Sequence, residues 1–299
     1  MNSFRKGFAL SIVLWIVAVI LLGIAYIASL SKDNLELAIM LKDKLNTQIV
    51  AKNYLEALKY YILTANYDGQ KLINSFDKPK LPTSIIVDGR EYIIDNVKIS
   101  LYDDSSLVRP YNLSLFLPKN NDRELTFTIK DSLLDWMDED NKARLNGAES
   151  TYYSIVNKLG YYPSNINSLQ SINELRLIRG IKDINENEWL RKKKEISIKN
   201  GRINFMLISK EYLKLLLKLS NEEVEELIKI RESDPIKYHY LILNQQNFND
   251  EYMGFWLSKV IHIKIQVKKN KARSKLNTVI YFNILNTKKP FYIDSYRLY

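Results

Sequence analysis

FALSIVLWIVAVILLGIAYIASL, residues 8–30, is the stretch that decides how this chain is organised. It contains no charged side chain over 23 residues, and an α-helix needs ~20 apolar residues to cross a bilayer. The seven residues before it, MNSFRKG, carry Arg5 and Lys6. Because basic flanks stay on the cytoplasmic side, the stretch predicts a single membrane pass with the rest of the chain outside the cytoplasm.

Two simpler interpretations of the same stretch remain open. A cleaved secretory signal usually has an apolar region of only about 7–15 residues and an A-x-A-like cleavage site. Here the apolar run is longer, and a cut near Ala28 or Ser29 would place Tyr26 or Ile27 three residues before it. The second alternative is an ordinary signal anchor that is never cleaved.

The composition limits the chemistry that the chain can perform. Its 299 residues include no cysteine, which excludes disulfides, thiolate ligands and a cysteine nucleophile. The only histidines are His239 and His262, which leaves few residues from which a histidine-based metal site or catalytic triad could be built. The net charge of +10 is compatible with nucleic acid, with an anionic membrane surface, or with a merely solvated surface.

The helical pattern continues beyond the apolar stretch. No glycine or proline occurs from Lys32 to Asp68, and apolar residues recur mostly at three-to-four spacing. They are Leu37, Leu41, Leu45, Ile49, Leu55, Leu58 and Ile62. This pattern predicts one continuous helix from Phe8 to about Ala65 whose second half buries its stripe against a folded domain. Two helices with a bend near Ser31 are the alternative.

Strand-like and helical segments then alternate in blocks. SIIVDG, REYIID and NVKISLYDD, residues 84–104, favour strands, with a hairpin turn at Asp88-Gly89. Residues 119–247 are largely helical or loop, and strand-like runs resume in residues 259–299. Lysines alternate with apolar residues from Val260 to Val267, which predicts a half-buried or edge strand. The fold class is therefore α+β: a long helix on an antiparallel sheet, with a large α-helical insertion.

An acidic loop is the strongest candidate for a metal site. Asp138, Glu139 and Asp140 are consecutive, and Glu149 follows after a glycine-containing loop. Clustered carboxylates favour Ca²⁺, which accepts 6–8 oxygens in irregular geometry. The spacing is not that of an EF-hand. The alternative is a solvated acidic turn in which Asp138 or Asp140 caps a helix.

Two motifs carry a family resemblance. The junction Lys6-Gly7-Phe8 before an apolar helix resembles the class III signal of type IV pilin-like proteins. DWMDEDNKARLNGAESTYY, residues 135–153, and PSNINSLQSINELRLIRGI, residues 163–181, resemble the K-type minor pseudopilins of type II secretion. Ile12 stands at the fifth position after Gly7, where most pilins have glutamate, and an apolar residue there is typical of the K type. Residues 84–117 match the family poorly.

The resemblance implies a pilin-like fold, a defined cleavage of the leader and a defined place in the cell. A prepilin peptidase would cut after Gly7 and methylate Phe8, and the apolar helix would stay in the bacterial inner membrane with the folded part in the periplasm. The expected segments are a leader (1–7), a transmembrane helix (8–30), the pilin-like helix and first strands (31–118), an inserted α-domain (119–247) and the last strands (248–299).

The resemblance also implies calcium and a set of partners. The expected ligands are Asp138, Asp140 and Glu149, with Asp135 as a weaker candidate. Ile12 would mark a subunit at the tip of the pseudopilus, in contact with other minor pseudopilins, the secretion machinery and its cargo. No enzymatic activity is expected.

Two alternatives come from other functional classes. A pilus tip protein for DNA uptake would use the basic tail and two helical hairpins, but Glu222, Glu223, Glu225 and Glu226 would repel phosphate. Ser220 and Glu223 instead fit a helix capping box. A membrane-anchored periplasmic hydrolase would need a catalytic cleft at the acidic loop, with two carboxylates as acid and base.

Overall fold

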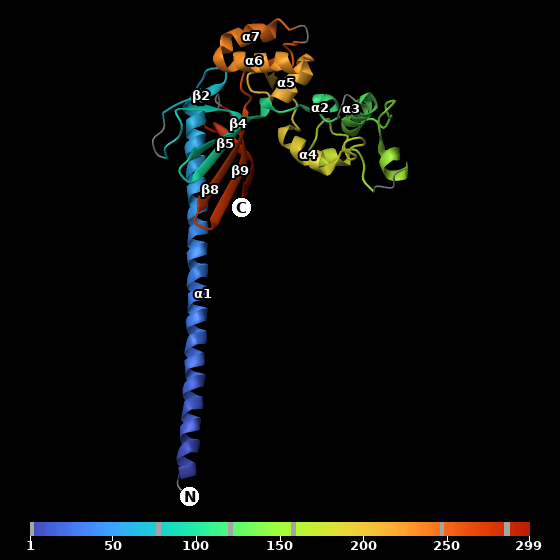
Figure 1. Cartoon of the computed structure of the whole chain (residues 1–299). Coiled ribbons are helices and arrows are strands. Elements are labelled where there is room, and N and C mark those ends of the chain that lie inside the picture. The colour runs from blue at the N-terminus through green and yellow to red at the C-terminus, as the bar shows by residue number, and fades with distance from the viewer. Residues whose placement is uncertain (1–2, 76–78, 119–121, 157–159, 246–247, 284–287) are drawn as a thin grey trace.

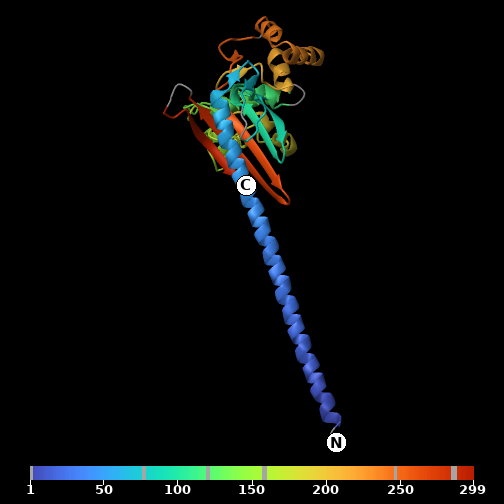
Figure 2. The ribbon, with the colours of Figure 1, turned by 90° about the vertical axis from the view of Figure 1, so that its left-hand side faces the viewer.

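One long helix extends from the N-terminal end of the chain into the folded body. The computed structural model describes residues 3–75, 79–118, 122–156, 160–245, 248–283 and 288–299, with the side chains of 3–11 and 156 left aside. Helix α1 (Ser3–Thr64) is unbroken over 62 residues, about 93 Å at 1.5 Å per residue. Figures 1 and 2 show its first half projecting away from the folded body. The predicted single helix is confirmed, and there is no bend near Ser31.

The end of α1 packs on a five-stranded antiparallel sheet. The strands are β4 (Asp88–Ile94), β5 (Val97–Asp103), β8 (Val260–Lys269), β9 (Ala272–Phe282) and β10 (Phe291–Leu298), in the order β10-β9-β8-β5-β4. Leu55 and Leu58 of α1 are buried where the helix contacts β8 and β9. The α+β prediction is confirmed. Since β8 lies in the middle of the sheet with alternating burial, the half-buried prediction for residues 260–267 is confirmed and the edge alternative is wrong.

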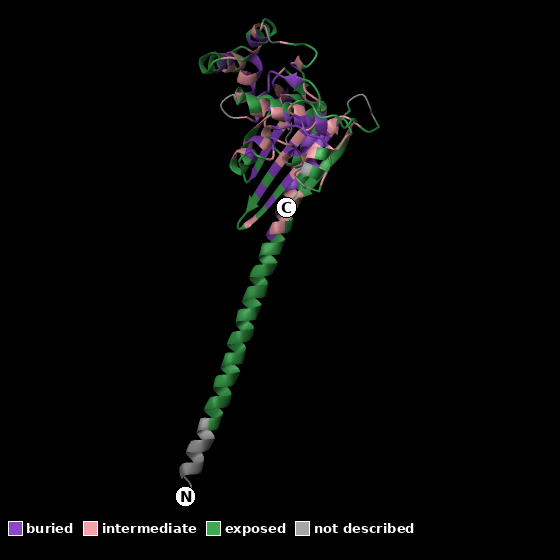
Figure 3. Cartoon of the chain, turned by 90° about the vertical axis from the view of Figure 1, so that its right-hand side faces the viewer, coloured by how far each residue is buried: buried purple, intermediate pink, exposed green. Residues whose placement is uncertain are grey.

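The first half of the predicted apolar stripe is not buried. Leu37, Leu41, Leu45 and Ile49 are each about half exposed or more, and Figure 3 shows the described side chains of the helix exposed from Ile12 until the helix meets the sheet. The reason is that the β8–β9 hairpin covers a different side of α1, where Thr47 is buried and its Oγ1 lies 2.7 Å from Ser274 Oγ. The stripe therefore faces outward, without a partner in the described part of the chain.

The predicted hairpin turn at Asp88-Gly89 is wrong. The chain forms a separate small sheet from β1 (Asn66–Tyr67), β2 (Lys71–Ile73) and β3 (Ser84–Ile86) before it enters β4. Gly89 lies inside β4, at a register shift against β5, with φ +93°. The turn falls at Asp95-Asn96, where Asp95 adopts φ 51°, a left-handed conformation that aspartate tolerates.

The helical part is an insertion between two paired strands. β5 pairs with β8, although more than 150 residues separate them in the sequence. The helices between them are α2 (Leu113–Phe116), α3 (Arg123–Met137), α4 (Glu186–Lys192), α5 (Lys210–Leu217), α6 (Asn221–Ser233) and α7 (Pro235–Leu243). Two short strands, β6 (Ile203–Asn204) and β7 (Met253–Gly254), pair in parallel. In Figure 1, α5–α7 lie beyond the end of α1, while α3 and α4 extend to one side.

A buried ionic network joins the insertion to the sheet. Asp104 Oδ2 accepts from Arg109 at 2.6 Å, and Asp104 Oδ1 lies 3.0 Å from His262 Nε2 on β8. Burial raises the pKa of the Asp104 carboxyl, but the hydrogen bond from His262 and the charge of Arg109 outweigh it and hold that pKa below its usual value. The Ser197 hydroxyl donates to the same carboxylate. The network fixes the exit from the sheet.

The second helical hairpin has the predicted capping box. Ser220 Oγ accepts from Glu223 N at 3.2 Å, and Glu223 Oε2 accepts from Ser220 N at 2.8 Å. These bonds satisfy free donors at the start of α6. Val224 and Leu227 of α6 are buried, so the segment packs within the helical insertion.

Candidate metal centre

Helix α3 positions the first carboxylate. Asp122 caps its start by accepting from Leu125 N at 3.0 Å, and Ile129, Leu133 and Trp136 form its buried face. Asp135 lies beside Trp136 and is fully buried. The helix ends when the chain turns extended at Asp138, which leaves two carboxylates at its C-terminal end.

The acidic loop returns a third carboxylate to the same place. Asp135, Asp138 and Glu149 each bring a carboxylate oxygen within 4.8 Å of the others. Gly147 makes this close approach possible, because a Cβ at that position would lie 1.8 Å from Asp135 Oδ2. Arg179 holds the loop by donating to Gly147 O at 2.9 Å.

One arginine partly neutralises the cluster. Arg144 Nη1 lies 2.5 Å from Asp135 Oδ1 and 2.5 Å from Asp138 Oδ2. These two hydrogen bonds raise the pKa of Arg144 further above its usual value. Glu149 accepts no such hydrogen bond from Arg144. Its side chain is buried, and both of its carboxylate oxygens, like Asp138 Oδ1, lack a hydrogen-bond partner.

The environment of Glu149 makes it an unpaired buried acid. Burial, with the negative charges of Asp135 and Asp138, raises the pKa of Glu149 to about 7. A buried carboxylate without a partner is costly, so native proteins usually pair it or place it on a metal. Three unsatisfied oxygens on two residues of one acidic cluster fit a hard cation, and an all-oxygen set is the kind that Ca²⁺ prefers.

The structure gathers some of the predicted ligands but not all. Asp138 and Glu149 lie in the cluster, and Asp135, the weaker candidate, is its buried centre. Asp140 lies outside it and is exposed, with Oδ1 accepting from Lys142 N at 2.8 Å. Glu139 is also exposed and accepts from Asn167 at 3.0 Å.

Sequence reasoning missed Gly147 and Arg144. Gly147 permits the close approach of the loop, and Arg144 bridges two of its carboxylates. The three-residue spacing of Asp135 and Asp138 at the end of an amphipathic helix was the available signal for giving Asp135 a larger role.

The other predicted residues lie elsewhere. Gly7 and Phe8 belong to α1, and their side chains are not among those described. Ile12 is 44% exposed on the same helix. None of these three positions belongs to the carboxylate cluster.

Two buried aromatic side chains, Trp136 and Tyr153, lie on the same two segments as the carboxylates. Trp136 and Tyr153 are buried, with ring centroids 5.2 Å apart in an edge-on arrangement. Trp136 Nε1 donates to Glu174 Oε1 at 2.7 Å. Tyr153 accepts from Arg179 N at 3.1 Å. The two rings are packing residues that fix the orientation of α3 against the loop.

This part of the chain matches a known family. Residues 113–185 match the family model described as type II secretion system (T2SS), protein K. Residues 113–185 are thus similar to a domain of protein K of type II secretion. The matched residues contain all three clustered carboxylates of this chain, together with Arg144 and Gly147.

A solved structure is also similar to this chain. It is a chain of the crystal structure of the GspK-GspI-GspJ complex from the enterotoxigenic Escherichia coli type 2 secretion system. The TM-score is 0.48 at 13% sequence identity, over 90% of this chain and 98% of that one. No curated protein shows significant sequence similarity to the chain.

Changing Gly147 to alanine should damage the centre. The new methyl group would collide with the buried Asp135 carboxylate, and overpacking of this kind costs about 1–3 kcal/mol. We expect the melting temperature of the full chain in detergent to fall by several degrees. Gly254→Ala is the matched control, because nothing lies within 4 Å of its added Cβ. Equal melting of the two variants would show that the loop does not need a glycine here.

Proposed function

We propose that the chain acts at the tip of the type II secretion pseudopilus and supports export of proteins across the outer membrane. The observation that carries this proposal is the match of residues 113–185 to protein K of type II secretion. Helix α1 is the one helix in the described part of the chain that is long and apolar enough to cross a membrane. It would hold the chain in the bacterial inner membrane, with the folded body in the periplasm.

The position of Ile12 supports a place at the tip. Prepilin peptidase would cut after Gly7 and methylate Phe8, which makes Ile12 the fifth residue of the mature chain. Most pilins have glutamate there, which is thought to pair with the N-terminal amine of a neighbour. A subunit at the very tip has no neighbour ahead of it, so it loses nothing by lacking the carboxylate.

The shape of the body supports the same place. Figure 1 shows α3 and α4 extending well to the side of α1. Such an extension would collide with neighbours in a stacked filament but is free at its end. The exposed stripe of Leu37, Leu41, Leu45 and Ile49 would pack against the helices of other minor pseudopilins.

We further propose that Asp135, Asp138 and Glu149 hold calcium. The unsatisfied oxygens of Asp138 and Glu149 favour a cation, and the loop would stay ordered because the cation balances its charges. Arg144, whose side chain is 39% exposed, would move away from the carboxylates when the cation binds. The centre is proposed to be structural, with no enzymatic reaction.

A secretion assay tests the tip assignment. In a strain that lacks its own K-type gene, we expect the wild-type chain to restore export of a reporter substrate. Ile12→Glu should give no improvement and is expected to reduce export. A charged carboxylate costs ~2.5–3.5 kcal/mol at the centre of an apolar helix and less near its end, and a tip subunit has no amine ahead to offset that cost. Clearly better export by the variant, or its normal incorporation along the whole filament, would contradict the tip assignment.

A further inference from the structure

The end of the β8–β9 hairpin is strongly basic. Residues 268–275, KKNKARSK, contain five basic residues and no acidic one. Four of them form the end itself, which we call the basic tip: Lys268, Lys269, Lys271 and Arg273. All four are exposed.

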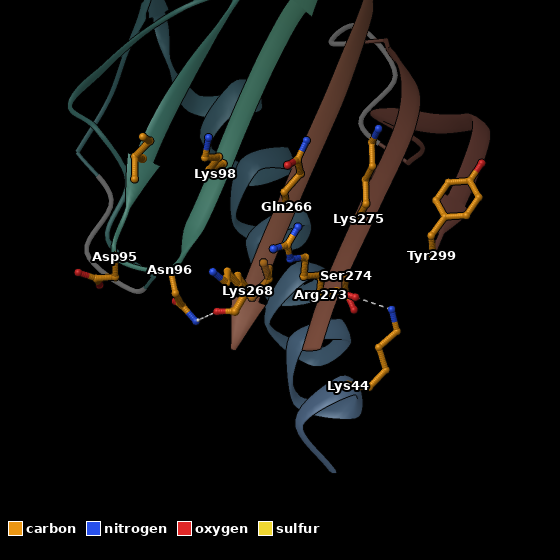
Figure 4. A pocket seen from close by; sticks show the side chains of 12 residues that line it. Lys44, Asp95, Asn96, Lys98, Gln266, Lys268, Arg273, Ser274, Lys275 and Tyr299 are labelled. Atoms are coloured by element: carbon orange, nitrogen blue, oxygen red, sulfur yellow. Dashed lines mark hydrogen bonds between the residues drawn. The ribbon is translucent and has the colours of Figure 1, made fainter. Parts of the chain in front are cut away.

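The basic tip extends onto the outer face of the sheet. Lys268 lies opposite Arg273, and the next outward-facing row contains Gln266 and Lys275, with Lys98 on β5 beside them. Figure 4 shows these side chains on the face of the sheet turned away from α1. They line a hollow of about 750 Å³ whose described lining includes five basic residues and a single acidic side chain, Asp95.

Several of these charges have no acidic partner. Lys269 pairs with Asp43 at 3.2 Å and Lys271 with Glu36 at 3.4 Å, both on α1. Within the described residues, the side chains of Lys268, Arg273 and Lys275 form no ion pair. The tip therefore keeps an excess of positive charge after its contacts with α1 are counted.

The contact with Glu36 gives the height of the tip above the membrane. The uncharged stretch of α1 ends at Leu30, six residues before Glu36. At 1.5 Å per residue this is only ~9 Å along the helix axis. The headgroup layer of a bilayer extends about 5–7 Å beyond the hydrocarbon core, and charges act over about 10 Å at 0.1 M salt. Figures 1 and 2 show the hairpin end directed toward the N-terminal half of α1.

We propose that the basic tip binds the anionic phospholipid headgroups of the membrane that α1 spans. The proposal rests on the anchoring of α1 described above. Phosphate groups would meet Lys268, Lys271 and Arg273 as the first charges of the folded body. The contact would hold the body at a fixed height and rotation over the bilayer before the subunit leaves the membrane. Each basic residue near an anionic surface strengthens binding by roughly fivefold.

Lysine acetylation of the full chain in nanodiscs tests this contact. The probes are discs of phosphatidylcholine alone and discs that also contain phosphatidylglycerol. We expect acetylation of Lys271 to be about fivefold slower in the anionic discs, as measured by mass spectrometry. Lys229 and Lys237, on α6 and α7 at the far end of the body, should react equally in both discs. They serve as controls within the same molecule.

Two variants identify the cause. Lys268→Gln with Arg273→Gln should reduce the protection of Lys271 to less than twofold. Lys229→Gln with Lys237→Gln removes the same charge far from the membrane and should leave the protection unchanged. Equal rates for Lys271 in the two discs, or the same slowing at Lys229 and Lys237, would overturn the proposal. Resistance to alkaline extraction is measured separately and reports whether α1 is inserted in the membrane. A chain that is extracted would contradict the anchoring proposal as well. An inserted chain whose Lys271 is not protected would contradict the lipid contact alone.

Discussion

The full chain in detergent should melt about 5–10 °C higher with saturating calcium than with a chelator. A ligand that binds only the folded state adds RT ln(1 + [L]/Kd), or about 2.7 kcal/mol at a hundredfold excess over Kd. For a body of this size, each 1 kcal/mol moves the melting temperature by about 2–4 °C. The expected stabilisation comes from Glu149, a buried acid with no hydrogen-bond partner. The negative charges of two nearby carboxylates repel its own charge, and a bound cation would offset this repulsion.

Matched variants connect that shift to the cluster. Asp138→Asn with Glu149→Gln should abolish the calcium-dependent shift. Without calcium this variant should melt no lower than the wild type above pH 7, because it removes a buried charge whose pKa is raised to about 7. Glu139→Gln makes the same kind of change on an exposed neighbour and should retain the full shift. An equal shift in all three proteins, or no shift in the wild type, would remove the calcium proposal.

Gly7→Ile should abolish both processing and secretion. Residue 7 precedes the proposed cut, and a bulky side chain there is expected to exclude the chain from prepilin peptidase. The uncut leader would keep Arg5 and Lys6 attached to the start of the membrane helix. Their two charges would hold that end at the cytoplasmic surface and prevent the subunit from leaving the bilayer.

The measurement is export of a reporter substrate together with the size of the chain on a denaturing gel. Ser3→Ile is the control, since it places the same side chain in the leader away from the junction. Normal export by an uncut Gly7→Ile chain would show that processing at this junction is not needed.

Local patterns in the sequence predicted the elements of this fold well. The absence of glycine and proline from Lys32 to Asp68 was sufficient to predict an unbroken α1. The alternation of apolar and polar residues in residues 260–267 predicted a half-buried strand. These features depend on periodicity, which a single sequence displays directly.

Contacts between segments far apart in the chain were harder to predict from the sequence. Nothing local shows that β8 pairs with β5, so its central place in the sheet could not be distinguished from an edge. The stripe from Leu37 to Ile49 has the period of a buried face, yet the sheet reaches α1 from another side. Asp88-Gly89 has the composition of a turn, but tertiary pairing places the turn at Asp95.

The carboxylate cluster could be predicted only in part. The structure brings Asp138 of the acidic run together with Glu149, as expected. The ranking within the run was less accurate, because sequence spacing cannot show that Asp135 points inward while Asp140 accepts a local backbone hydrogen bond. Gly147 mattered through a contact across twelve residues, which no local pattern shows.

The most direct test of the central claim is the N-terminal residue of the wild-type chain extracted from the membrane of its own host. A minor pseudopilin of the K type should begin at Phe8, with a methylated amine, and should keep the whole apolar stretch to Leu30. A chain that begins at Met1, or near Ser29, would contradict the account.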